Sequence, residues 1–159
     1  MTRPRRPSNV VVEPLIGVAP LVTRWIERVL AAHEPQLTTG QFLALRAIAS
    51  ERLTAAELAR RTGVSGAAVS QLVAVLDQAG WIERSRTEGD RRRQALALSP
   101  AGSAVYASAA RLVRSRMGQL LTSLPAPEVD RLGHALERLE EALGGAPPPR
   151  RPPRPPRPH

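Results

Sequence analysis

The feature that most limits the fold of this chain is a pair of short helix patterns joined by a glycine turn, within residues 54–80. The run Thr54-Ala-Ala-Glu57 is a capping box, in which the Thr54 hydroxyl and the Glu57 carboxylate satisfy each other's free backbone N–H groups. A helix is therefore expected to begin near Ala55 and to stop at Gly63, because glycine readily adopts the positive φ that a tight turn between helices needs.

A second helix is predicted to start at Ser65, whose hydroxyl can cap it, and to end at Gly80. Small or apolar residues stand where two crossing helices touch: Leu58, Ala59, Gly63, Val64, Val69 and Leu72. Spacings of three and four residues predict an inward stripe of Val69, Leu72, Val73 and Leu76. The outward face is then Ser65, Gly66, Ala67, Ser70, Gln71 and Ala74. Together the two helices predict a helix-turn-helix.

A β-hairpin is predicted directly after the second helix. Trp81-Ile82 reads as a strand, residues 95–98 alternate with period two, and Glu88-Gly89-Asp90 between them is a turn. Five arginines lie in this segment: Arg84, Arg86, Arg91, Arg92 and Arg93. A hairpin that follows a recognition helix is a wing, and an arginine-rich tip suits a phosphate-lined minor groove. The alternative is that these charges are those of any solvated hairpin.

The end of this segment carries a family resemblance. Asp90-x-Arg92, followed by Leu96-x-Leu98-Ser99-Pro-Ala-Gly102, resembles the winged-helix signature of MarR-type transcriptional regulators. The resemblance extends from about residue 15 to residue 143 and implies a mainly α fold, a winged helix-turn-helix with a small β-hairpin wing and a helical dimerisation region. Two segments depart from the family pattern: residues 73–77 read Val-Ala-Val-Leu-Asp, where the family often has a polar residue and an arginine at the middle positions, and residues 66–68 are unusually plain.

The resemblance predicts a DNA-binding regulator that acts on double-stranded DNA. Candidates for contacts with base edges are Ser65, Ala67, Ser70 and Gln71, since glutamine can pair with adenine and the Ala67 methyl can meet a thymine methyl. Candidates for phosphate contacts are Arg60, Arg61, Arg91 and Arg93. At the wing we expect Arg92 to enter the minor groove and Asp90 to orient it by a charge-assisted hydrogen bond.

The remaining segments read as helices. Pro20 is predicted in the first turn of a helix that continues to about His33, because a proline inside a helix would cost about 3 kcal/mol. The sequence leaves open whether residues 10–18 add an earlier helical turn. A second capping box at residues 38–41 opens a helix with Phe42, Leu45 and Ile48 inward. A long helix follows Pro100 and runs to about residue 122.

The last helix carries apolar residues at alternating steps of three and four, which is typical of a coiled-coil seam. These residues are Val129, Leu132, Leu136, Leu139 and Leu143. Because a terminal helix has little left to cover in its own subunit, the pattern predicts a homodimer interface. In MarR-like dimers a small molecule binds where the dimer platform meets the winged helices, which implies a pocket bordered by Trp25, His33, Phe42, Arg46 and Tyr106. The alternative is that Trp25 and Phe42 are core residues and that His33 is a helix-terminal histidine.

The charge is concentrated at the two ends of the chain. Seven of the 23 arginines lie in the first seven and last ten residues, and without them the net charge falls from +9 to +2. The sequence predicts a basic flexible arm at 1–14, a winged-helix domain at 15–146 and a Pro/Arg-rich disordered tail at 147–159. Within the domain, the winged-helix core is expected at 54–99 and the dimerisation helices at 15–34 and 101–143.

Composition excludes several other classes. Without cysteine there is no disulfide, thiolate metal site or thiol redox sensor, and no stretch approaches about 18 apolar residues, so a cytoplasmic protein without membrane contact is expected. The three histidines lie in unrelated contexts and no nucleophile, base and orienter set stands out, so we predict no enzyme activity, metal or cofactor. The remaining alternative is a winged-helix module that binds protein rather than DNA, which the plain face at residues 66–68 favours.

Overall fold

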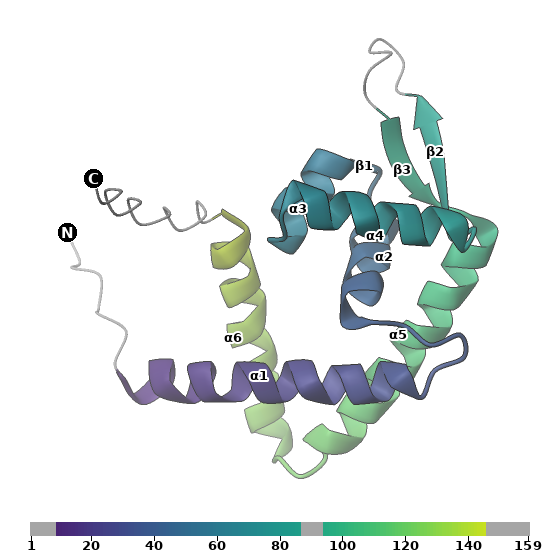
Figure 1. Cartoon of the computed structure of the whole chain (residues 1–159). Helices are drawn as coiled ribbons and strands as arrows, with labels where there is room; N and C mark the ends of the chain where they lie inside the picture. Colours follow the sequence, from purple (N-terminus) through teal and green to yellow (C-terminus); the bar gives the residue numbers. More distant parts are fainter. Residues whose placement is uncertain (1–8, 87–93, 146–159) are drawn as a thin grey trace, which may run out of the picture. The chain divides into compact units, whose positions relative to one another are not determined.

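A computed structural model describes residues 9–86 and 94–145, and within them the chain is mainly helical with one small sheet (Figure 1). In chain order the elements are α1 (Asn9–Ala31), α2 (Thr39–Ser50), β1 (Leu53–Thr54), α3 (Ala55–Thr62), α4 (Gly66–Gln78), β2 (Ile82–Arg86), β3 (Gln94–Leu98), α5 (Pro100–Leu121) and α6 (Ala126–Gly145). The chain divides into two compact units, residues 1–120 and 121–159. The predicted mainly α fold with a hairpin wing is confirmed.

The predicted helix-turn-helix is present in α3 and α4. The Thr54 hydroxyl accepts from the Glu57 N–H at 3.3 Å, and the Glu57 carboxylate accepts from the Thr54 N–H at 2.8 Å, so the capping box is complete. Gly63 ends α3 with φ of 70°, which is the left-handed conformation that the turn needs. The Ser65 hydroxyl accepts from the Ala68 N–H at 3.3 Å and opens α4.

The two helices pack largely as their spacing predicts. Leu58, Val69, Val73 and Leu76 are buried, and Leu72 packs against them while partly exposed. Val64 was expected to face inward and is instead 42% exposed. It lies in the turn between Gly63 and the Ser65 cap, outside both helices, so helical spacing does not govern its direction.

The sheet has three antiparallel strands in the order β1-β3-β2. The predicted hairpin pairs Ile82 with Leu98 and Arg84 with Leu96. The third strand, β1, has only two residues and pairs Leu53 with Leu96 on the other side of β3. This strand was not predicted, because two residues are too few to show alternation.

The first helix corrects one prediction. α1 begins at Asn9, so Pro14 and Pro20 lie inside it and Pro20 is not in its first turn. Each proline leaves one carbonyl four residues earlier without its helical partner. Both prolines lie on a stretch of α1 where every described side chain except Val12 is exposed, so water can satisfy those carbonyls and the cost is lower than in a buried helix.

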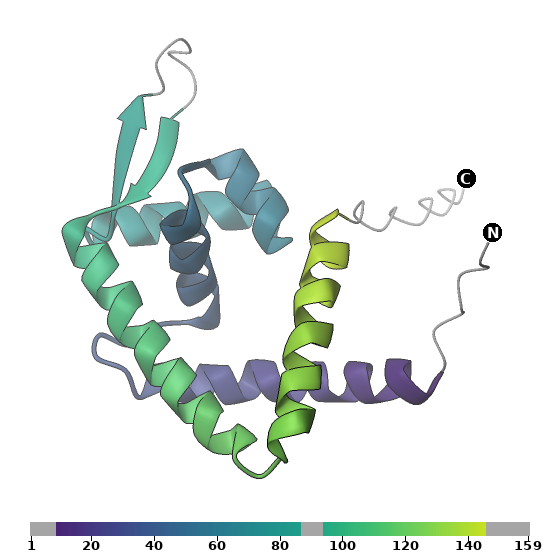
Figure 2. The same ribbon diagram turned by 180° about the vertical axis from the view of Figure 1, so that it is seen from behind.

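The core of the first unit gathers around α2. Its buried residues include Phe42, Leu45 and Ile48, as the second capping box and helical spacing predict. Leu30 from α1 and Ala109 from α5 are buried in the same cluster. In Figure 2, which shows the fold from behind, α2 is enclosed within this unit between α4 and α1. α5 ends at Leu121, close to the predicted residue 122.

In the described ranges, 9–86 and 94–145, no helix is long and apolar enough to cross a membrane. The same ranges hold no group of three or more histidine, cysteine, aspartate or glutamate side chains that could bind a metal ion.

Candidate DNA-binding surface

The outward face of α4 is accessible along its length. All four candidates for base contacts, Ser65, Ala67, Ser70 and Gln71, are exposed. α4 carries no basic residue, so any attraction of this surface to phosphates must come from neighbouring elements. The face therefore offers one amide, two hydroxyls and methyl groups, which can contact base edges in a major groove.

The two hydroxyls on this face differ in what they have left to offer. Ser65 Oγ is used as an acceptor by the Ala68 N–H, so its proton remains available to a base. Ser70 Oγ donates to the Gly66 carbonyl at 2.9 Å. Ser70 can therefore accept a hydrogen bond from a base without rearrangement, but must break its backbone bond in order to donate one.

The two arginines of α3 are placed differently. Arg60 is 77% exposed, and its guanidinium lies 3.9 Å from the Glu57 carboxylate, a loose contact that leaves it accessible. Arg61 forms an ion pair with Glu51, the residue that follows α2. A phosphate at Arg61 would have to displace that carboxylate, so the two predicted phosphate contacts are not equivalent.

The base of the predicted wing lies at the C-terminal end of α4 (Figure 1). Asp90, Arg91, Arg92 and Arg93, the predicted wing contacts, lie outside the described residues. Arg84 lies within them and was not assigned a role by sequence. Its Nε and Nη2 lie 3.1 and 2.9 Å from Oδ2 of Asp77, near the end of α4, and its Nη1 lies 3.5 Å from Oε1 of Gln94.

Ser99 connects the end of α4, the hairpin and the start of α5 by hydrogen bonds. Its N–H donates to the Trp81 carbonyl at 3.1 Å and its hydroxyl donates to the Gly80 carbonyl at 2.6 Å. The same hydroxyl accepts from the Gly102 N–H at 2.9 Å, which confirms the predicted capping chemistry. A Cβ at Gly102 would overlap the Trp81 carbonyl oxygen, so only glycine lets α5 approach this closely.

The five residues predicted to border a ligand pocket occupy different surroundings. Phe42 is buried, and its ring centroid is 5.9 Å from that of partly buried Tyr106. His33 is buried with both ring nitrogens engaged, Nδ1 at 2.8 Å from the Pro35 carbonyl oxygen and Nε2 at 2.7 Å from Ser108 Oγ. Since a carbonyl only accepts, Nδ1 carries a proton. Arg46 is exposed on α2.

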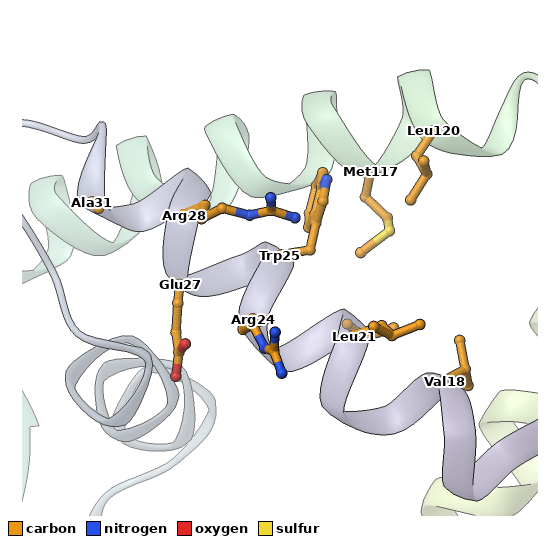
Figure 3. Close-up of a pocket in the computed structure, with 10 residues that line it drawn as sticks. Val18, Leu21, Arg24, Trp25, Glu27, Arg28, Ala31, Met117 and Leu120 are labelled. Carbon is orange, nitrogen blue, oxygen red and sulfur yellow. The ribbon is translucent and has the colours of Figure 1, made fainter.

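Trp25, the fifth of these residues, lines an open groove of about 560 Å³ between α1 and the C-terminal part of α5 (Figure 3). Its walls are mainly apolar, with Leu21 on α1 and Met117 and Leu120 on α5. Trp25 and Met117 point toward one another across the groove, and the side chain of Arg28 extends toward Trp25. The groove thus includes Trp25 but not the ring pair Phe42 and Tyr106.

Comparison with known proteins identifies the family. The family model described as "MarR family" matches residues 36–93. The HTH-type transcriptional repressors Rv2887 of Mycobacterium tuberculosis and Mb2911 of Mycobacterium bovis are each 31% identical over 104 residues, which cover 65% of this chain and 75% of the relative. The chain belongs to the MarR family.

Solved structures of family members share the fold. A mutant form of E. coli MarR superposes with a TM-score of 0.72 at 25% identity, over 81% of this chain and 95% of that one. Rv2887 in complex with p-aminosalicylic acid superposes with a TM-score of 0.68 at 26% identity, over 81% and 97%. This MarR-family chain is therefore a winged-helix DNA-binding transcriptional regulator.

The contacts that connect the elements of this regulator were not predicted from the sequence. Asp77 and Arg84 are seven positions apart on either side of a turn, and Glu51 and Arg61 are ten apart. In neither pair do the two partners lie on the same element, so helical periodicity does not bring them together. One indirect signal for the Asp77 ion pair was available in the sequence. Asp77 is the single charged residue of α4, and a carboxylate near the C-terminal end of a helix is stabilised by a neighbouring cation.

Proposed function

We propose that this MarR-family regulator is a homodimeric repressor of a palindromic operator and that a small ligand, with aromatic acids as the first class to test, releases it from DNA. The observation that carries the proposal is the exposed face of α4, capped by Ser65 and flanked by the accessible Arg60. The sign of regulation follows that of the relatives, which are named as repressors. The proposal includes a cytoplasmic location and assigns no catalytic step.

The dimer is proposed from apolar surface that each unit leaves exposed. On α6 the predicted seam residues Leu132, Leu136 and Leu143 are 39%, 50% and 67% exposed, while Val129 and Leu139 are partly buried. The N-terminal part of α1 exposes a second set: Val10, Val11, Leu15, Ile16, Val18, Leu21 and Val22. So much exposed apolar surface is unusual for a monomer and favours association of two copies.

DNA contacts are proposed on α3, α4 and the wing. Ser65, Ala67, Ser70 and Gln71 would read base edges, while Arg60, Arg61, Arg91 and Arg93 would hold phosphates. Arg92 would enter the minor groove with Asp90 as its orienting carboxylate. The C-terminal arginines would add attraction to phosphates that depends on salt but not on DNA sequence.

The effector is proposed from the neighbours. Structures of Rv2887 hold p-aminosalicylic acid and salicylic acid, which are aromatic acids. In this chain the proposed ligand contacts are Trp25, which lines the open groove, and four residues that do not line it: His33, Phe42, Arg46 and Tyr106. Trp25 is the first to test, because it faces an open groove and has a cation, Arg28, beside it.

Footprinting on the DNA upstream of the protein's own gene, with and without salicylate, tests the proposal. A protected palindrome that is lost on adding salicylate is the expected result. Protection unaffected by salicylate would remove the effector from the proposal. Absence of binding to any duplex at low salt would favour the alternative, a winged-helix module that binds another protein, because even non-specific DNA binding is retained at low salt.

A further inference from the structure

Asp77 is an unexpected residue for the recognition helix of a DNA-binding protein. It is the single charged side chain of α4 and lies in the helix's last turn. A carboxylate there is unfavourable for two reasons: the C-terminal end of a helix carries partial negative charge, and DNA phosphates repel it. Asp77 therefore needs a cation, and the structure supplies one from the wing.

The cation is Arg84, whose guanidinium joins three elements. Two of its nitrogens, Nε and Nη2, lie 3.1 and 2.9 Å from the same oxygen of Asp77 on α4. Its third nitrogen, Nη1, lies 3.5 Å from the amide oxygen of Gln94 on β3. Both members of the ion pair are about two-fifths exposed, so the contact is accessible to solvent but not detached. In this position Arg84 faces α4 rather than open solvent.

The position of Arg84 along β2 lets its contact with Asp77 restrict the motion of the hairpin relative to α4. Ile82, at the base of β2, is buried in the core. Arg84 points to the same side two residues farther out, at a distance of about 7 Å along the strand. At the level of Arg84, β3 is already held on its other side by β1, which pairs with Leu96 and Ala95, whereas β2 is an edge strand of the sheet. The contact with Asp77 attaches this edge to α4 as well and so restricts twisting of the hairpin relative to the helix.

We propose that Arg84 is a positioning residue, which holds the wing at a fixed angle to α4 and neutralises Asp77, rather than a phosphate contact. The proposal rests on the DNA-binding function proposed above. It predicts that Asp77, although negatively charged, promotes binding to DNA. A phosphate-binding Arg84 predicts the opposite, because removing Asp77 would then release the arginine toward DNA.

The test measures binding to a labelled duplex of mixed sequence by fluorescence anisotropy at several salt concentrations. Asp77→Asn is expected to weaken binding by about two- to fivefold, the range of an exposed ion pair. The control is Glu83→Gln, which removes the same charge from the opposite face of β2 and should leave binding unchanged or tighter. If Asp77→Asn tightens binding as the control does, the proposal is overturned.

A double-mutant cycle separates the two roles of Arg84. The double variant Asp77→Asn/Arg84→Gln should match Asp77→Asn within about twofold, because the contact is already lost, whereas Arg84→Gln alone should bind more weakly than either, since it leaves the Asp77 carboxylate without its cation. All three should show the same dependence on salt. A loss of about 0.9 units of salt slope in Arg84→Gln but not in Asp77→Asn would identify Arg84 as a phosphate contact and refute the proposal.

A measurement without DNA makes the result independent of the proposed function. Because the chain has no cysteine, spin labels can be attached at Ala74→Cys on α4 and Arg86→Cys at the end of β2. Doubly labelled protein is mixed with excess unlabelled protein, so that each dimer carries one labelled chain. Asp77→Asn should broaden the distance distribution between the labels, and an unchanged distribution overturns the proposal. Failure of the wild-type protein to bind DNA would instead refute the proposed function alone.

Discussion

Single residues at the junction of the winged helix decide how closely its elements approach. Gly102 has buried backbone in the first turn of α5, against the Trp81 carbonyl. Gly118 lies in the same helix with open space around it. The two glycines therefore occupy the same type of element under opposite packing conditions, and a methyl group added at each should have opposite effects.

Gly102→Ala is expected to destabilise the protein by about 3 kcal/mol or more, because the added methyl overlaps backbone that cannot move without shifting α5. Gly118→Ala should stabilise it by about 0.5–1 kcal/mol, since alanine is the better helix former. Urea unfolding followed by circular dichroism measures both. Equal effects of the two substitutions would show that the Gly102 contact does not constrain α5.

The ion pair between Arg61 and Glu51 sets up a competition with DNA. Glu51→Gln should free Arg61 and tighten binding to a mixed-sequence duplex by about two- to fivefold, with a steeper salt slope by up to about 0.9 units. The same substitution in an Arg61→Gln background controls for the general loss of negative charge. A gain of equal size in both backgrounds would mean that Arg61 does not reach phosphate.

At the scale of elements, Ser99 joins the end of α4 to the start of α5. It caps α5 and also binds the Gly80 carbonyl, so one buried hydroxyl serves two elements. Ser99→Ala should cost about 1–2 kcal/mol in unfolding free energy, because it removes the cap and leaves a carbonyl unpaired. Ser99→Thr keeps the hydroxyl and should recover most of that loss in the same urea titration. If threonine is as destabilising as alanine, shape rather than hydrogen bonding determines this site.

Local chemistry explains which elements the sequence predicts well. The capping boxes at Thr38 and Thr54 and the glycine at residue 63 act within four residues of the chain, and each marks a helix boundary that the structure confirms. The predicted start of α1 was wrong, because α1 holds Pro14 and Pro20 in its interior, on a stretch whose side chains are almost all exposed, despite the cost of an interior proline. The short strand β1 depends on pairing with β3, more than 40 residues away, and has no local signal.

In the candidate site, too, features with a local sequence signal were predicted and contacts between distant segments were not. The exposed face of α4 follows from helical periodicity, and the structure confirms its exposure. The pairs Asp77–Arg84 and Glu51–Arg61 form only after chain segments meet. Sequence therefore identifies the surface that is offered to DNA but not which of its arginines are already occupied by a carboxylate.

At the scale of the whole molecule, assembly is the property to test first. Light scattering at micromolar concentration should give the mass of a dimer. Leu136→Glu should give a monomer, because a carboxylate buried in an apolar interface costs several kcal/mol. DNA affinity should fall with it, since one half-site supplies only part of the binding.

His134→Glu is the matched control for this substitution. It also introduces one carboxylate, two residues away on the opposite side of α6, and should leave the dimer intact. A wild-type monomer would contradict the proposed interface, as would dissociation of both variants to the same extent.

The two hydrogen bonds from Ser99 to Trp81 and Gly80 have a consequence for evolution and engineering. They hold the two ends of the hairpin together, because Gly80 and Ser99 are 19 residues apart in the chain and are joined by a hydrogen bond. Changes in length or sequence between Arg86 and Gln94 need not be transmitted to the helices, just as exposed loop tips generally tolerate insertion. The corresponding segment of a relative, grafted between these two residues with Ile82 and Leu96 kept in the core, should therefore alter DNA preference while leaving the rest of the protein as stable as before.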